Sequence, residues 1–263
     1  MICFAGNSLL CRVALRDTAI DAASFTAIRM ASGAAALWLI VRWRDGVTGV
    51  RGTWLSALAL FGYAATFSYA YLALTAATGA LILFGSVQAG MIGYGLARGE
   101  RFTPLQLAGF VLALAGLGGL LSPGLTAPPL SAALLMMLAG LSWAVYSLRG
   151  RGAGDPTQVT AGNFMRTLPF AAALALVAAP ALHVDAAGAA YAVASGAIAS
   201  GMGYAIWYTA LKGLRATTAA TVQLSVPAIA AAGGVLLLGE ALTLRLVLAS
   251  AAILGGIAMV LRR

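Results

Sequence analysis

The chain has 263 residues, of which 62% are hydrophobic and 9% are charged. An ordinary soluble domain carries roughly 45–50% apolar and about 25% charged residues, so the composition excludes that class and predicts a protein of the lipid bilayer. The net charge of +9 does not indicate a nucleic-acid partner, because the basic residues occur one to three at a time between apolar runs and form no contiguous patch.

Apolar runs long enough to cross a bilayer follow one another along the chain. A spanning helix needs about 20 apolar residues, and the charge-free runs 52–97 and 102–148 each provide two such lengths around a break rich in Gly, Pro or Thr. The sequence predicts an all-α integral membrane protein with ten transmembrane helices, at 1–15, 19–41, 53–74, 78–97, 103–122, 129–148, 158–180, 186–211, 216–238 and 243–261.

The first apolar run has neither a basic leader nor a cleavage site, so we expect it to be kept as a helix rather than removed as a signal peptide. Whether Met1 is the natural start stays open. The two cysteines, eight residues apart in this run, have neither a metal-ligand spacing nor the pattern of a disulfide framework.

The positions of the cations predict the orientation, since Lys and Arg concentrate in cytoplasmic loops. If both termini are cytoplasmic, the inner loops and the C-terminal tail hold eleven of the sixteen cations and the outer loops hold two. The other three lie within helices or near their ends, where a charge facing lipid is costly. We expect Arg12 and Arg29 to reach the interface and Arg166 to face a polar partner.

An internal repeat relates the two halves of the chain. Residues 75–121 align with 215–261 without a gap, and the matched positions include two Gly-Glu pairs, at 99–100 and 239–240. The repeat predicts two units of five helices, at 1–122 and 129–263.

Because five is an odd number, the second unit crosses the membrane in the opposite sense to the first. Glu100 is then cytoplasmic and Glu240 lies outside. Inverted repeats are typical of secondary transporters that bind their substrate near the midplane and open alternately to the two sides. The sequence therefore predicts such a transporter.

The phrase Leu-Leu-Leu-Gly-Glu-Ala-Leu-Thr at 236–243, after Val226-Pro227, resembles the EamA domain of the drug/metabolite transporter superfamily. The phrase at 96–103 repeats its Gly-Glu pair, so the resemblance covers both halves. Segments 141–146 and 203–207 are similar to those of YddG-type aromatic amino-acid exporters. The resemblance implies export of aromatic and other neutral amino acids across a bacterial inner membrane, through a cavity lined mainly by helices 1, 3, 4, 6, 8 and 9.

Pro227 lies inside the predicted helix 216–238, where its ring clashes with the carbonyl of Gln223. We expect a kink there, because broken backbone is tolerated in membranes where it lines a cavity. This predicts a hinge at Pro227, with a merely structural kink as the alternative. The first repeat has Val87 where the family usually has proline, so the hinge argument applies to the second repeat.

Aromatic side chains at helical spacing on helices 53–74 and 186–211 favour an apolar cavity wall, and a few polar groups near the midplane would hold an amino-acid zwitterion. For the aromatic residues the alternative is a lipid-facing position, and for the polar residues it is hydrogen bonding between helices. The predicted substrate-binding residues are Asn7, Ser8, Tyr63, Phe84, Ser86, Ser142, Trp143, Tyr204, Trp207 and Gln223.

The acidic residues all fall at predicted helix ends or in loops. Proton-coupled transporters generally hold a carboxylate or histidine within the membrane, so we expect facilitated export. The alternative cargo is another small metabolite or a drug cation of the same superfamily. The sequence shows no catalytic constellation, so we expect no enzyme, cofactor or metal, and a monomer or weak homodimer. The exact substrate, direction and ion coupling stay open.

Overall fold

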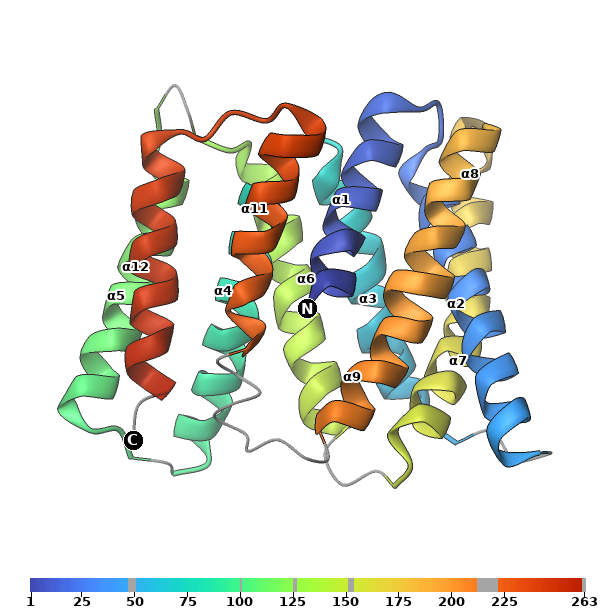
Figure 1. Cartoon of the computed structure of the whole chain (residues 1–263), viewed down its shortest axis with the longest axis horizontal. Helices are drawn as coiled ribbons and strands as arrows, with labels where there is room; N and C mark the ends of the chain where they lie inside the picture. The colour runs from blue at the N-terminus through green and yellow to red at the C-terminus, as the bar shows by residue number, and fades with distance from the viewer. Residues whose placement is uncertain (47–50, 100, 125–126, 151–153, 212–221, 262–263) are drawn as a thin grey trace.

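The computed structural model describes residues 1–46, 51–99, 101–124, 127–150, 154–211 and 222–261. All regular structure in these ranges is helical, and the helices run up and down side by side (Figure 1). Their bounds are α1 Ile2–Asp17, α2 Ala22–Asp45, α3 Trp54–Tyr71, α4 Ala76–Ala97, α5 Pro104–Leu121, α6 Leu130–Arg149, α7 Pro156–Val177, η1 Ala179–Ala181, α8 Ala186–Val193, η2 Ala194–Met202, α9 Gly203–Leu211, α11 Ser225–Leu238 and α12 Leu244–Leu261.

Local chemistry explains where several helices begin and end. The Asp21 carboxylate accepts the first free N–H groups of α2, and Thr103 forms a capping box with Gln106 at the start of α5. Gly239 ends α11 in the left-handed conformation, with φ +64°, which favours glycine. Gly99, its counterpart in the aligned sequence, has φ +88°. The left-handed backbone conformation therefore explains why each Gly-Glu pair has a glycine at its first position.

The predicted helix 186–211 is one continuous rod made of α8, the π-helical segment η2 and α9. The predicted helix 216–238 is seen from Ser225 onward as α11. Residues 212–221 and Glu100 lie outside the described residues, so the structure does not place Glu100 relative to Glu240.

Within the part of the chain that the structure describes, six helices are long and apolar enough to cross a membrane, judged by length and composition. They are α2, α4, α5, α6, the rod from Ala186 to Trp207, and α12. The outside of the bundle presents large apolar side chains such as Leu58, Leu107 and Leu248, each at least half exposed. Such a surface suits lipid contact, because a soluble monomer rarely exposes so large an apolar area.

The contacts made by helices in the first half of the chain have counterparts in those made by helices in the second half. The helices α5 and α12 pack against each other at one edge of the bundle (Figure 1), and α2 packs against α7. The helix α6 contacts α3 and α4, and α1 makes the corresponding contacts with η2 and α11. Gly109 and Gly256 let α5 and α12 approach closely, because a Cβ on either would overlap the carbonyl oxygen of the other.

Another close approach joins α2 to η2. A Cβ on Gly196 would overlap Ser32 Oγ and the carbonyl oxygen of Arg29, and a Cβ on Gly33 would lie 3.1 Å from the carbonyl oxygen of Gly196. The two backbones therefore meet at a pair of glycines, and their approach sets the position of the η2 side chains beside α2.

We predict that Gly196→Ala lowers the free energy of unfolding by about 1–3 kcal/mol, because the added methyl group overpacks this crossing. Thermal unfolding in detergent micelles measures the change. Gly118→Ala is the matched control, since a Cβ there meets nothing within 4 Å and alanine favours a helix. Equal melting temperatures for the two variants would contradict the prediction.

Candidate functional site

A narrow cavity lies inside the bundle among α1, α3, α4, α6 and α9. Its volume open to water-sized molecules is about 20 Å³, which is room for about one water. A larger occupant therefore requires helices to move apart. The cavity is lined by Phe4, Asn7, Tyr63, Phe67, Leu83, Phe84, Val87, Trp143, Tyr204 and Gln223.

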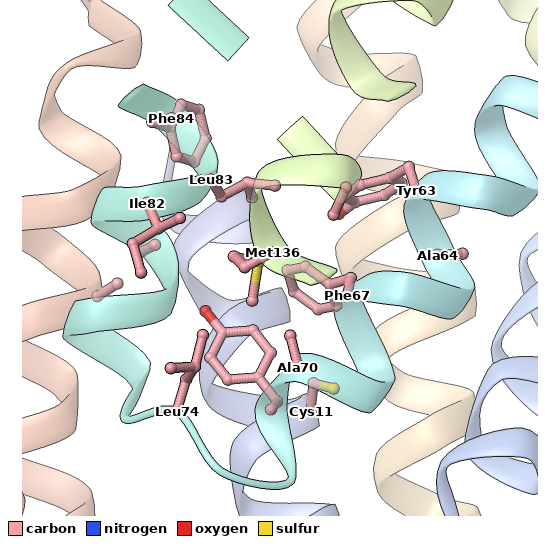
Figure 2. Close-up of a cluster of buried hydrophobic side chains, with 14 of the residues drawn as sticks. Cys11, Tyr63, Ala64, Phe67, Ala70, Leu74, Ile82, Leu83, Phe84 and Met136 are labelled. Carbon is pink, nitrogen blue, oxygen red and sulfur yellow. The ribbon is translucent and has the colours of Figure 1, made fainter. Parts of the chain in front are cut away.

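The Trp143 ring is the centre of an aromatic cluster around this cavity. Its centroid lies 4.9 Å from that of Tyr63, 5.2 Å from that of Tyr204 and 6.4 Å from that of Phe4. The first two pairs are tilted and the third is edge-on, at separations that aromatic pairs prefer. Figure 2 shows part of the same wall, where Tyr63 and Phe67 of α3 approach Leu83 of α4 and Met136 of α6. The rings form a mostly apolar enclosure contributed by α1, α3, α6 and α9.

Six of the ten predicted substrate-binding residues line the cavity, namely Asn7, Tyr63, Phe84, Trp143, Tyr204 and Gln223. Trp207 lies beside it, with its ring centroid 6.0 Å from that of Phe4. The three predicted serines lie between helices instead. Ser8 is buried on α1, Ser86 lies against Gly140 of α6, and Ser142 faces Gly62 of α3.

Four further residues line the cavity outside this set of ten, and the sequence held a signal for two of them. Phe4 is one helical turn before Asn7, and Phe67 is one turn after Tyr63, so each continues a face that was already marked. Leu83 and Val87 are ordinary apolar helix residues, which nothing in a single sequence separates from lipid-facing ones.

A chain of hydrogen bonds runs from Asn7 and Tyr63, which line the cavity, to side chains behind its wall. The Tyr63 hydroxyl accepts from Asn7 Nδ2 at 3.2 Å and from Arg29 Nη2 at 3.1 Å. Ser195 donates to Asn7 Oδ1, and Arg29 Nε donates to Ser200 Oγ at 3.4 Å. Ser195 and Ser200 both belong to η2, a kind of segment that is often found at functional sites. The network joins α1, α2, α3 and η2.

The position of Arg29 corrects the expectation that it reaches the membrane interface. Its side chain is 0% exposed, because it lies in the second turn of a 24-residue helix and points into the bundle. The guanidinium carbon lies 5.2 Å from the Tyr63 ring centroid and 5.0 Å from that of Phe67. Since both rings line the cavity, the buried cation lies directly behind its wall.

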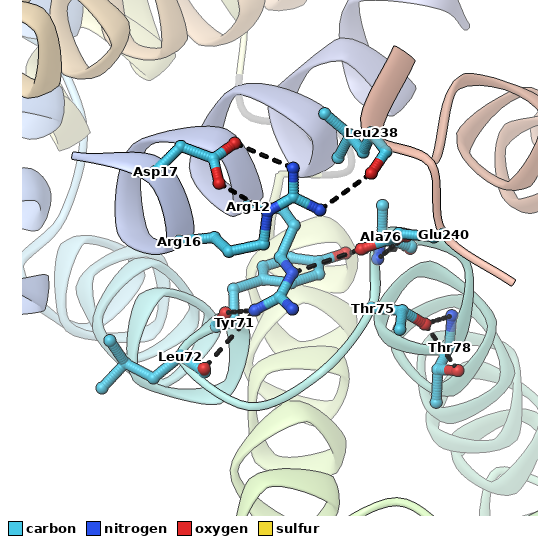
Figure 3. Close-up of polar contacts among 10 residues, drawn as sticks. All are labelled: Arg12, Arg16, Asp17, Tyr71, Leu72, Thr75, Ala76, Thr78, Leu238 and Glu240. Atoms are coloured by element: carbon cyan, nitrogen blue, oxygen red, sulfur yellow. Dashed lines mark hydrogen bonds and ion pairs between the residues drawn. The ribbon is translucent and has the colours of Figure 1, made fainter. Parts of the chain in front are cut away.

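Arg12, also expected to reach the interface, forms an ion pair at one end of the bundle. Its Nε lies 3.2 Å from Glu240 Oε1, and its Nη1 donates to the Tyr71 carbonyl at 2.9 Å (Figure 3). Glu240 Oε2 accepts the Ala76 N–H at 2.8 Å, at the N-terminus of α4, where the helix dipole favours a negative charge. The Arg12–Glu240 pair thus connects α1 with the α3–α4 and α11–α12 turns at one end of the bundle.

Arg166 meets its expected kind of partner, since its Nη1 donates to the carbonyl oxygens of Gly162 at 2.9 Å and Arg51 at 3.2 Å. Pro227 is buried and is the third residue of α11. Proline is well tolerated in a first turn, so the helical break lies just before it, at Leu224, rather than in the middle of an unbroken helix.

Among the residues that the structure describes, no group of three or more His, Cys, Asp or Glu side chains lies together. These residues therefore offer no metal-binding cluster. Two wider hollows open on the outside of the bundle, around Trp43 and between α5 and α12, and most of the lining surface of both is apolar. Their position and lining suit lipid, whereas the inner cavity combines rings with polar groups.

Comparison with protein families gives a match over residues 130–262 to the model described as the EamA-like transporter family. The chain is 59% identical over 262 residues to an uncharacterized protein, PA1977, of Pseudomonas aeruginosa, covering 99% of this chain and 91% of that protein. It is also 35% identical over 159 residues to the threonine/homoserine exporter RhtA of Salmonella typhimurium, covering 57% of this chain and 52% of the exporter.

A solved crystal structure has a similar fold, with a TM-score of 0.67 and 22% sequence identity, covering 97% of this chain and 95% of that chain. At this identity the likeness concerns the fold alone. Together the matches cover both halves of the chain, because the family model matches the second half and the crystal structure spans nearly all of it.

We predict that Glu240→Ala lowers the free energy of unfolding by about 3 kcal/mol, because it leaves Arg12 and the Ala76 N–H without their carboxylate in a largely buried place. Asp17→Ala is the control. It breaks the ion pair between Arg16 and Asp17, whose side chains are 33% and 44% exposed. The free energy of unfolding should therefore fall by at most about 1 kcal/mol. Thermal unfolding in detergent compares them, and an equal loss in both would refute the structural role of the Arg12–Glu240 pair.

Proposed function

The chain belongs to the EamA-like transporter family of the drug/metabolite transporter superfamily, and from this premise we propose that it exports aromatic and other neutral amino acids across a bacterial inner membrane. The observation that carries the proposal is the cavity in which the Trp143, Tyr63 and Tyr204 rings surround a polar wall. An apolar enclosure with a few placed polar groups suits an aromatic side chain joined to a zwitterion.

The proposed architecture is ten transmembrane helices in two inverted units, 1–122 and 129–263, with both termini in the cytoplasm. The matching contacts of α1 and α6 support it, as do the left-handed glycines at 99 and 239. In an inverted repeat the binding site lies between the units near the midplane, and the cavity takes its walls from both units.

Alternating access follows from the two ends of the bundle. The Arg12–Glu240 pair ties α1 to the ends of α4 and α11 on the side that this orientation makes external. In the proposed cycle this pair holds the outer end closed while substrate enters from the cytoplasm, and it separates for release. The break at Leu224, next to Pro227, is the proposed hinge of α11.

We propose facilitated export rather than tight proton coupling. The carboxylates that the structure describes lie at helix ends or in turns, and none of them lines the cavity. A proton-coupled transporter generally keeps a titratable group within the membrane.

The match to RhtA favours a second cargo. That relative is named for threonine and homoserine, which are neutral amino acids with short polar side chains. The same polar wall would hold their zwitterions, and the rings would then be only partly covered by the substrate. Threonine and homoserine therefore belong in any panel of test substrates beside phenylalanine, tyrosine and tryptophan.

We predict that Trp143→Ala reduces phenylalanine counterflow in proteoliposomes about tenfold, because the ring at the centre of the cluster is lost. Trp54→Ala is the matched control and should leave the flux unchanged, since Trp54 is 58% exposed and packs on Phe170 away from the cavity. If the protein transports threonine but not phenylalanine in this assay, the second cargo is the correct one. Undiminished phenylalanine flux in Trp143→Ala would contradict the site.

The inverted topology predicts that cysteines at 100 and 241 react from opposite sides of the membrane. In a variant with Cys3 and Cys11 replaced by serine, an impermeant maleimide should label Glu100→Cys from the cytoplasmic side and Ala241→Cys from outside. Position 241 is chosen because Glu240 is held in its ion pair. Labelling of both cysteines from one side would refute the two inverted units.

A further inference from the structure

Arg29 is a buried cation whose contacts are with neutral groups. Its side chain is 0% exposed, its Nη2 and Nε donate to the hydroxyls of Tyr63 and Ser200, and its plane lies near two aromatic rings. The ion pairs of the described residues use Arg12, Arg16 and Arg44 as their cations. Hydroxyls and rings orient a guanidinium, but they do not neutralise it, and an unpaired charge within a membrane is costly.

The network around Arg29 also has unused hydrogen-bond donors. Arg29 Nη1 has no partner among the described residues. The Tyr63 oxygen accepts two bonds, from Asn7 and Arg29. Since a hydroxyl has two acceptor positions and one proton, neither of these two bonds uses the Tyr63 proton. Asn7 Nδ2 likewise uses one of its two protons.

These donors gather at one wall of the cavity. Asn7 and Tyr63 line it directly, and the Arg29 guanidinium lies behind the Tyr63 ring. Donors from three side chains with a single positive charge match a carboxylate, which is acceptor-only and offers about four lone-pair positions. Hydrogen bonds between ionised partners are also roughly twice as strong as neutral ones. This set of donors therefore suits an anion with several acceptors.

We infer that Asn7, Tyr63 and Arg29 form the subsite for the carboxylate of the transported amino acid, with Arg29 supplying the charge. The inference rests on the proposed function and adds to it the group by which the cargo is recognised. It also selects against cationic drugs, because a cation placed among the same rings would be repelled by the Arg29 charge behind them.

The inference predicts that the protein distinguishes L-phenylalanine from L-phenylalaninamide, which differs by an amide in place of the carboxylate. Ligand binding raises the melting temperature in proportion to the logarithm of its concentration over its Kd, so thermal shifts in detergent give the ratio of the two affinities. We expect phenylalanine to bind about tenfold more tightly than the amide, and equal affinities in the unsubstituted protein would overturn the inference.

The variants test which side chain provides the selectivity. In Arg29→Gln the affinity ratio should fall to about one, while Arg29→Lys, which keeps the charge, should retain part of it. Arg166→Gln is the matched control, because that arginine donates to backbone carbonyls of Gly162 and Arg51 away from the cavity, and it should keep the full ratio. A ratio unchanged in Arg29→Gln would refute the subsite.

If Arg29→Gln does not fold, Tyr63→Phe decides. It keeps the ring and removes the hydroxyl proton, so the affinity ratio should fall about threefold, and an unchanged ratio would again refute the subsite. Counterflow separates this inference from the proposed function. Selective binding of phenylalanine without flux would support the carboxylate subsite and contradict amino-acid export. Transport of phenylalanine and its amide with equal affinity would support export and contradict the subsite.

Discussion

Within a bilayer a guanidinium has no water around it, and two arginines of this bundle meet that constraint in different ways. Arg12 has a carboxylate partner within the protein, Glu240, and also donates to the Tyr71 carbonyl. Among the described residues, Arg29 has only neutral hydrogen-bond partners, and its Nη1 has none. The first arrangement holds helices together at one end of the bundle. The second leaves a positive charge beside the cavity, which a bound anion would complete.

Small residues bring the helices close enough together for these polar groups to meet. The backbones of α2 and η2 meet at Gly33 and Gly196, so the short side chains of Ser195 and Ser200 reach Asn7 and Arg29 across the interface. In a π-helical segment residues five apart are joined by the backbone hydrogen bonds, which places the two serines near one another on η2. Close backbone packing and a buried polar network thus arise from the same local geometry.

The helical architecture could be predicted from the sequence because hydropathy and helix length report directly on the bilayer. Helix ends were predicted to within a few residues at capping positions such as Thr103 and Gly239. Asn7, Tyr63 and Trp143, which line the cavity, could be predicted as candidates because a polar or aromatic group within an apolar helix is conspicuous. The approach of Phe84 and Tyr204 to the same cavity needed the fold to confirm it.

The remaining features depend on contacts that a single sequence does not contain. Arg12 and Glu240 are 228 residues apart, so their pairing is visible only in the folded bundle. Arg29 was expected at an interface because it lies near the start of a predicted helix. The expectation was wrong because hydropathy does not show the direction in which a side chain points. The roles of Ser195 and Ser200 depend on η2 being a π helix, and no residue pattern distinguished it from the α-helix on either side.

The most direct test of the account is an experimental structure of the protein with L-phenylalanine bound in lipid. The account predicts the phenylalanine ring among Tyr63, Trp143 and Tyr204, and its carboxylate within hydrogen-bond distance of the Tyr63 hydroxyl, at the Arg29 side of the cavity. Phenylalanine bound in an outer, lipid-facing groove, or inside the cavity with its ammonium group toward Arg29, would contradict it.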